Sequence, residues 1–167
     1  MTAVQAKTMS TNTSGAIVLG PGEGLRLGSG PGRDGIFKLT GEQTGGAFDY
    51  FVVEVPPGNG PPLHVHHGRE ETFHVLSGQY KVRLGEEIFY VKEGDFAYLP
   101  SKIPHAFLNI SDKPGRIIVV YTPGGGHKFF EEFGPVVRNG HPDRAVIAQI
   151  FEKHNMTLLG PPLSPDD

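Results

Sequence analysis

The chain has 167 residues, a length typical of one domain, and it has no cysteine, which excludes disulfides, thiolate metal sites and cysteine nucleophiles. Its net charge of -3 and its scattered Lys and Arg residues exclude the basic surface that binds nucleic acid or an anionic membrane. No apolar stretch has the length of a transmembrane helix and the first residues lack the features of a secretory signal, so we expect a cytoplasmic protein with no membrane partner.

The first part of the chain is rich in small residues. Residues 1–15 are small and polar, and we expect a flexible N-terminal arm there. Residues 20–35 contain many glycines but lack the Gly-Lys-Ser/Thr ending of a phosphate-binding loop, so we expect loops around a short strand. The whole chain contains 24 Gly and 15 Pro, a composition that excludes a helical bundle and favours many short strands joined by tight turns.

The middle of the chain alternates with a period of two from Ile36 to Tyr121, in segments bounded by Gly, Pro, Asn or Asp. The first clear strand ends at Pro56 and places Tyr50 and Val52 on one face, which we expect to be the inner one. The later strands are expected at 63–66, 71–76, 79–84, 87–92, 96–99, 104–109 and 116–122. No helical crossover separates these segments, so residues 16–125 are predicted to form an all-β, small antiparallel barrel or sandwich.

The pattern changes after Gly126. A short helix is expected from His127 to Phe133, and an amphipathic helix over 142–154 has an apolar stripe made of Val146, Ile147, Ile150 and Phe151. Residues 126–167 are therefore predicted to form a C-terminal helical segment that packs on the barrel and ends in a short mobile tail.

Four side chains in the strand region are candidate metal ligands. His64 and His66 are two residues apart in a strand, so both point to the same face. Glu71 lies on the inner face of the next expected strand, where a carboxylate is costly unless it is paired or bound to metal. His105 points inward from a later strand. The four side chains can converge on one ion only if the sheet closes on itself.

Each candidate also has a plain structural interpretation. His105 alone can be a hydrogen-bonded strand histidine, and a His-x-His pair recurs by chance on exposed strands. Glu70 competes with Glu71 for the inward position. The histidines of the C-terminal part are expected at the surface without partners; they are His127, His141 and His154.

Two motifs resemble a known family. Residues 58–78 read G-x5-H-x-H-x4-E-x6-G, and residues 94–109 follow G-x5-P-x-G-x2-H-x3-N except that Lys102 replaces the third glycine. Both resemble the conserved motifs of the cupin superfamily, and the departure at Lys102 concerns a turn and no ligand. The flanking segments resemble single-domain cupins grouped with flavonol (quercetin) 2,4-dioxygenases.

The resemblance implies a cupin barrel, that is a double-stranded β-helix or jelly roll, in which His64, His66, Glu71 and His105 bind one divalent metal ion. Iron, manganese, nickel, cobalt, copper and zinc all suit this set of ligands. The main hypothesis is a metal-dependent dioxygenase that acts on a hydroxylated aromatic or enol compound, with dioxygen as co-substrate and Glu71 as both ligand and base. The expected substrate pocket consists of Tyr50, Val52, Phe73, Val82, Phe107 and Tyr121.

Two alternatives stay open at this point. One is a redox-inactive metal-dependent isomerase, decarboxylase or hydrolase, and the other is a non-catalytic cupin that binds a small molecule. In either case the partner is a small molecule. We also expect a homodimer, because small cupin barrels commonly pair through outer strands and open sheet edges favour pairing, with residues 16–40 supplying the surface.

Overall fold

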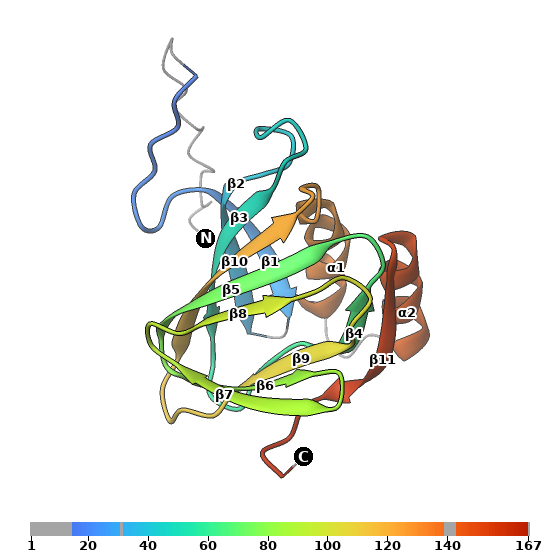
Figure 1. The fold of residues 1–167 in the computed structure, drawn as a ribbon. Coiled ribbons are helices and arrows are strands. Elements are labelled where there is room, and N and C mark those ends of the chain that lie inside the picture. The colour runs from blue at the N-terminus through green and yellow to red at the C-terminus, as the bar shows by residue number, and fades with distance from the viewer. Residues whose placement is uncertain (1–14, 31, 139–142, 167) are drawn as a thin grey trace.

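The computed structural model describes residues 15–30, 32–138 and 143–166, so the predicted N-terminal arm and His141 lie outside the described residues, apart from Gly15. The fold consists of two antiparallel sheets that enclose one hydrophobic core, with two helices at one end of the barrel (Figure 1). An all-β antiparallel barrel with C-terminal helices was the predicted fold class, and it is confirmed.

The larger sheet has the strand order β1-β2-β3-β10-β5-β8. Its strands are β1 (Leu25–Gly30), β2 (Arg33–Leu39), β3 (Asp49–Val55), β5 (Glu70–Ser77), β8 (Phe96–Leu99) and β10 (Gly115–Thr122). The smaller sheet has the order β11-β4-β9-β6-β7. It contains β4 (Pro62–His66), β6 (Gln79–Leu84), β7 (Glu87–Lys92), β9 (His105–Asn109) and β11 (Met156–Pro162). From β4 to β10, each strand lies within one or two residues of its predicted position.

The C-terminal part differs from the prediction in two elements: the first helix, expected to end at Phe133, continues to Arg138, and a strand follows the second helix. Helices α1 (His127–Arg138) and α2 (Arg144–Lys153) are present, and the side chain of Asp143 caps α2 by accepting a hydrogen bond from the Ala145 amide at 2.9 Å. The chain then forms β11, which was not predicted. The Gly-Pro-Pro at its end is unusual for a strand, and β11 exists because it pairs with the edge of β4.

The inner and outer faces of strand β3 are exchanged relative to the prediction. Phe51 and Val53 are buried in the core, whereas Tyr50 and Val52 lie on the outer face. The predicted inward orientation of Tyr50 and Val52 is therefore wrong. Both faces of this strand are apolar, so the alternation alone did not distinguish them, but exposed Glu54 has the same parity as Tyr50 and Val52 and marks the outer face.

Aromatic packing joins the helices to the barrel. Phe37 of β2 stacks on Phe51 of β3 with ring centroids 4.2 Å apart, and Phe130 of α1 lies 5.6 Å from each of these two rings. Phe129 of α1 in turn contacts Phe151 of α2 at 5.0 Å. The two helices thus bury their aromatic faces in the same core as the strands.

A buried carboxylate also attaches the start of α1. Asp49 is fully buried, and it accepts hydrogen bonds from the amides of Gly41 and Gly126 at 2.7 and 2.6 Å and from Nδ1 of His127 at 3.0 Å. His127 is itself buried, so the prediction of a surface histidine without a partner is wrong for this residue. It is also wrong for His154, whose Nε2 lies 3.4 Å from Glu132.

Candidate metal centre

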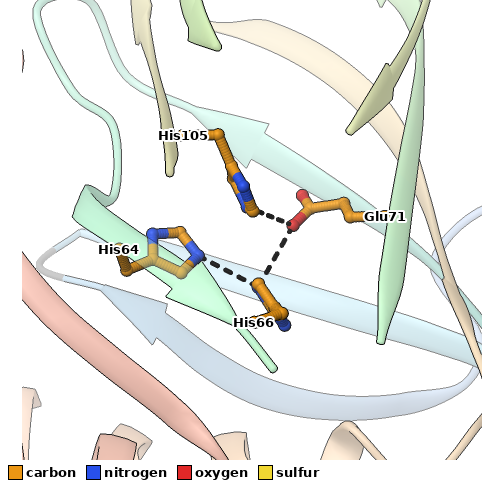
Figure 2. Close-up of side chains that lie close together, drawn as sticks. All are labelled: His64, His66, Glu71 and His105. Atoms are coloured by element: carbon orange, nitrogen blue, oxygen red, sulfur yellow. Dashed lines mark hydrogen bonds and ion pairs between the residues drawn. The ribbon is translucent and has the colours of Figure 1, made fainter. Parts of the chain in front are cut away.

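Four side chains from both sheets meet inside the barrel (Figure 2). His64 and His66 are on β4, and His105 is directly opposite His64 on β9, with ring centroids 4.6 Å apart. Glu71 comes from β5 in the other sheet. Closure of the two sheets is therefore what brings the carboxylate to the histidines.

The ligand atoms of this cluster lie within 4.8 Å of one another, and all four residues are buried. Nε2 of His64 is 3.1 Å from Nε2 of His66. Oε2 of Glu71 is 3.5 Å from Nε2 of His66 and 3.3 Å from Nε2 of His105 (Figure 2). Three imidazole nitrogens and one carboxylate oxygen thus face one small volume.

Backbone carbonyls orient two of the imidazoles. Nδ1 of His64 donates to the Pro62 carbonyl at 2.8 Å, and Nδ1 of His105 donates to the Ile103 carbonyl at 2.9 Å. With the proton on Nδ1, each Nε2 presents a lone pair to the cluster, which is the arrangement of a metal-binding histidine. Nε2 of His105 is buried and its polar neighbour across the cluster is Oε2 of Glu71 at 3.3 Å, so an ion held between these two atoms is a fitting occupant.

Burial keeps two of the imidazoles neutral. It lowers the pKa of His64 to about 3, and burial together with the nearby His64 holds the pKa of His66 well below its ordinary value. Burial also opposes the charged form of His105, but hydrogen bonding and attraction to Glu71 outweigh it and raise the pKa of His105. His64 and His66 are therefore unprotonated near pH 7, as ligands must be. The donor set fits a divalent ion of the first transition series.

A cavity adjoins the cluster and reaches two of its members, His64 and Glu71. Its walls are mostly apolar and aromatic, and come from both sheets and from both helices; they include Phe51, Val53, Phe107, Val119, Tyr121, Phe129, Phe130, Phe133, Phe151 and Met156. The centres of water molecules can occupy about 60 Å³ of it.

Of the six predicted pocket residues, the structure places two in the cavity wall. Phe107 and Tyr121 line it. Phe73 and Val82 are buried in the surrounding core without lining the cavity. Tyr50 and Val52 face away from it, because β3 points Phe51 and Val53 inward instead.

The prediction missed the helical and N-terminal parts of the wall. Phe151 of α2 lies edge-on to His64, with ring centroids 5.8 Å apart, and Arg33 and Ser29 enter from the turn between β1 and β2. The apolar stripe of α2 did indicate that Phe151 is buried, but nothing in the local pattern showed that it faces the histidines. For Arg33 the sequence offered one signal: it lies four residues before Phe37 on β2, so both side chains point to the same, inner face of the strand.

The turn at Lys102 keeps its glycine-like shape. Lys102 has φ of 69°, and its amide donates to the carbonyl of His66 at 2.7 Å. The lysine therefore adopts a left-handed conformation that glycine reaches without steric cost. The replacement leaves the contact between this turn and the ligand strand in place.

Comparison with known proteins agrees with this architecture. Residues 51–121 match the Cupin_2 family, a cupin domain. The chain is 38% identical over 74 residues to the uncharacterised protein MJ1618 of Methanocaldococcus jannaschii, which covers 44% of this chain and 59% of that protein. It is 30% identical over 107 residues to quercetin 2,3-dioxygenase of Bacillus subtilis, which covers 63% of this chain and 31% of that enzyme. The chain thus spans only part of the length of these curated relatives.

A solved structure of an RmlC-like cupin from Shewanella frigidimarina has the same fold, with a TM-score of 0.56 and 14% identity over 66% of this chain and 93% of that one. No helix in the described part of the chain is long and apolar enough to cross a membrane. The domain match, the fold shared with a solved cupin structure and the cluster of three histidines and one glutamate agree with one another, and residues 51–121 form a cupin domain.

Proposed function

We propose that this cupin is a metal-dependent dioxygenase that acts on a small hydroxylated aromatic or enol compound. The observation that carries the proposal is the position of Glu71, which belongs to the ligand cluster and also lines the apolar cavity. A group at this position can contact an ion and an organic molecule at the same time. The similarity to a quercetin dioxygenase supports the same class of reaction.

Each residue of the site has a role in this proposal. His64, His66, His105 and Glu71 would hold the ion, and four protein ligands leave two positions of an octahedral ion open. A bound redox-active ion supplies activation of dioxygen and lowers the pKa of a coordinated hydroxyl group. Glu71 would accept the proton of the substrate hydroxyl, and the phenylalanines of α1 and α2 would exclude water from the deprotonated compound.

The size of the cavity limits the substrate. The cavity of about 60 Å³ is smaller than the roughly 150 Å³ cavity that holds one benzene ring, so it accommodates one ring at most, and only if its wall widens. A three-ring flavonol would require α1 or α2 to move away from the barrel, because their aromatic side chains form part of the wall. We therefore propose a one-ring or smaller compound as the substrate.

The test begins with elemental analysis of purified wild type beside His66→Ala, each produced with several divalent metals supplied. The matched control is His74→Ala, which removes an exposed histidine of β5. We expect about one ion per chain in the wild type and the control, and near-complete loss in His66→Ala. Oxygen uptake is then measured with one-ring catechols and enols and with quercetin.

The outcomes separate the alternatives. Oxygen uptake with a one-ring compound that is lost in His66→Ala supports the dioxygenase. Stoichiometric zinc without any oxygen uptake favours a redox-inactive isomerase, decarboxylase or hydrolase. Absence of metal under every supply contradicts the metal-dependent proposal and favours a small-molecule-binding cupin.

We also propose that the chain forms a homodimer through residues 16–40. Strand β1 is an edge strand of the larger sheet, and an open edge favours pairing with a second copy. Val18 in the same segment is 82% exposed, which a partner would cover. Light scattering at micromolar concentration should give the mass of two chains, and a strict monomer would refute the dimer.

A further inference from the structure

Arg33 is a buried cation that the proposed chemistry does not use. It is the first residue of β2 and has the same inward parity as Phe37, and only 4% of its surface is exposed. It lines the cavity together with His64 and Glu71. Burial lowers the pKa of Arg33 to about 10, so the side chain is still positively charged at neutral pH.

The guanidinium group of Arg33 is only partly satisfied. Nη2 donates to the carbonyl of Ser29 at 2.8 Å, whereas Nη1 is buried without a hydrogen-bond partner among the described residues. No carboxylate in the described part of the chain forms an ion pair with Arg33. An unpaired buried charge is costly, so a group outside the protein is expected to neutralise it.

The end of β1 fits closely around this side chain. Gly30 has φ of 153°, and a Cβ atom at this position would collide with the guanidinium group of Arg33. Oγ of Ser29, which also lines the cavity, is a second buried polar atom without a hydrogen-bond partner among the described residues. Ser29 and Arg33, each with a buried polar atom that lacks a partner among the described residues, thus line the same apolar cavity.

We propose that Arg33, assisted by Ser29, binds a carboxylate group of the substrate, so that the substrate is a small hydroxy or enol acid. This inference rests on the proposed function in taking the cavity at Glu71 as the substrate site. Guanidinium and carboxylate groups match in charge and in planar geometry, and the remaining wall is mostly apolar. The acid's carboxylate would lie at Arg33 and its hydroxyl at Glu71, which favours a small molecule in a cavity of this size.

Calorimetric titration with benzoate and with neutral, nearly isosteric benzamide tests the carboxylate site. We expect wild type to bind benzoate at least 30-fold more tightly than benzamide, and Arg33→Gln to bind benzoate at least 30-fold more weakly than wild type. The matched control is Arg116→Gln, which changes an exposed arginine of β10 and should leave the affinity within twofold. Arg33→Lys keeps the charge but not the planar pair of donors, and should lie between wild type and Arg33→Gln.

Thermal unfolding separates a binding role from a structural one. Benzoate should raise the melting temperature of wild type and not that of Arg33→Gln, and without ligand Arg33→Gln should melt no lower than wild type because it lacks the buried charge. The benzoate titration is repeated in His66→Ala to make the result independent of the metal. If this variant binds benzoate within tenfold of wild type, Arg33 is assigned as the carboxylate site even if the dioxygenase proposal fails.

Equal affinity of wild type and Arg33→Gln for benzoate would overturn the inference. The smaller acid 2-oxobutanoate is titrated in the same way. Failure of wild type to bind both benzoate and 2-oxobutanoate would also overturn the inference. Inorganic phosphate or chloride that binds wild type more tightly than either acid would assign Arg33 to an inorganic anion instead.

Discussion

The ligand cluster and the cavity wall are built in different ways. The cluster comes from three strands, β4, β5 and β9, whose side chains alternate regularly, and two of its members are cross-strand neighbours. The wall combines the β1–β2 turn, both sheets, both helices and the start of β11, between Ser29 and Met156. Strand parity thus determines which groups can bind an ion, whereas the closing of the C-terminal segment over the barrel determines what else fits beside it.

The largest expected effect concerns the wall. Phe151 is 3% exposed and contacts Phe129 and His64, so Phe151→Ala should lower the free energy of unfolding by about 3–5 kcal/mol through lost burial and the cavity it leaves. Urea unfolding measures this change. The control is Phe96→Ala, where the ring is 61% exposed and the loss should stay below about 1 kcal/mol. Similar losses in both variants would mean that α2 is not an integral part of the wall.

A smaller effect is expected at the attachment of α1. Asp49→Asn replaces a carboxylate that accepts three hydrogen bonds, including one from His127, and should cost about 2–3 kcal/mol. Asp34→Asn is the matched control, because its ion pairs with Arg26 and Arg138 are at the surface and contribute under about 1 kcal/mol. Chemical denaturation of both variants gives the comparison. An Asp49→Asn variant as stable as Asp34→Asn would contradict the buried anchoring.

The ligand cluster should make the metal-free protein sensitive to pH. The lowered pKa values of His64 and His66 keep them neutral when folded, whereas in the unfolded chain they take up protons as the pH falls below about 6.5. His105, with its raised pKa, acts in the opposite direction. That opposition is confined to pH values above about 6.5, because at lower pH His105 is protonated in both the folded and the unfolded chain. Well below pH 6, His64 and His66 together then lower the unfolding free energy by up to about 2.7 kcal/mol per pH unit.

This dependence is measured as urea midpoints of chelator-treated protein at pH 7.5, 6 and 5. His66→Gln should halve the slope below pH 6, because it leaves His64 as the one remaining histidine of the cluster with a lowered pKa. A wild-type midpoint that does not change with pH would show that the folded cluster takes up protons as readily as the unfolded chain.

The smallest effect is expected at Lys102, the residue that replaces a glycine of the second motif. Lys102→Gly relieves a left-handed lysine and should stabilise the protein by about 0.5–1 kcal/mol after the greater chain entropy of glycine is included. Lys92→Gly, at an exposed position in β7, should instead destabilise by a similar amount. Thermal unfolding of the two variants should show shifts of opposite sign. Shifts of the same sign would mean that the conformation of Lys102 carries no cost.

The same contrast explains how far the sequence predicts this molecule. The strands from β4 to β10 and the four grouped side chains follow from alternation and turn residues, because each strand carries its own pattern. The inner face of β3 was predicted wrongly because both faces of this strand are largely apolar. Strand β11 was not predicted because it forms only by pairing with β4. The parity of Arg33 with Phe37 and the apolar stripe of α2 indicate that Arg33 and Phe151 are buried, but only tertiary packing brings them to the cavity.

Strand β11 has a mechanical consequence. It pairs with β4 so that Met156 lies opposite His66 and Leu158 opposite His64, and only two residues, His154 and Asn155, connect it to α2. A movement of α2 is therefore transmitted through β11 to β4, the strand that carries His64 and His66. A bulky molecule that pushes α2 outward would pull on the strand that carries two of the four grouped side chains, so amide exchange along β11 would report what occupies the barrel.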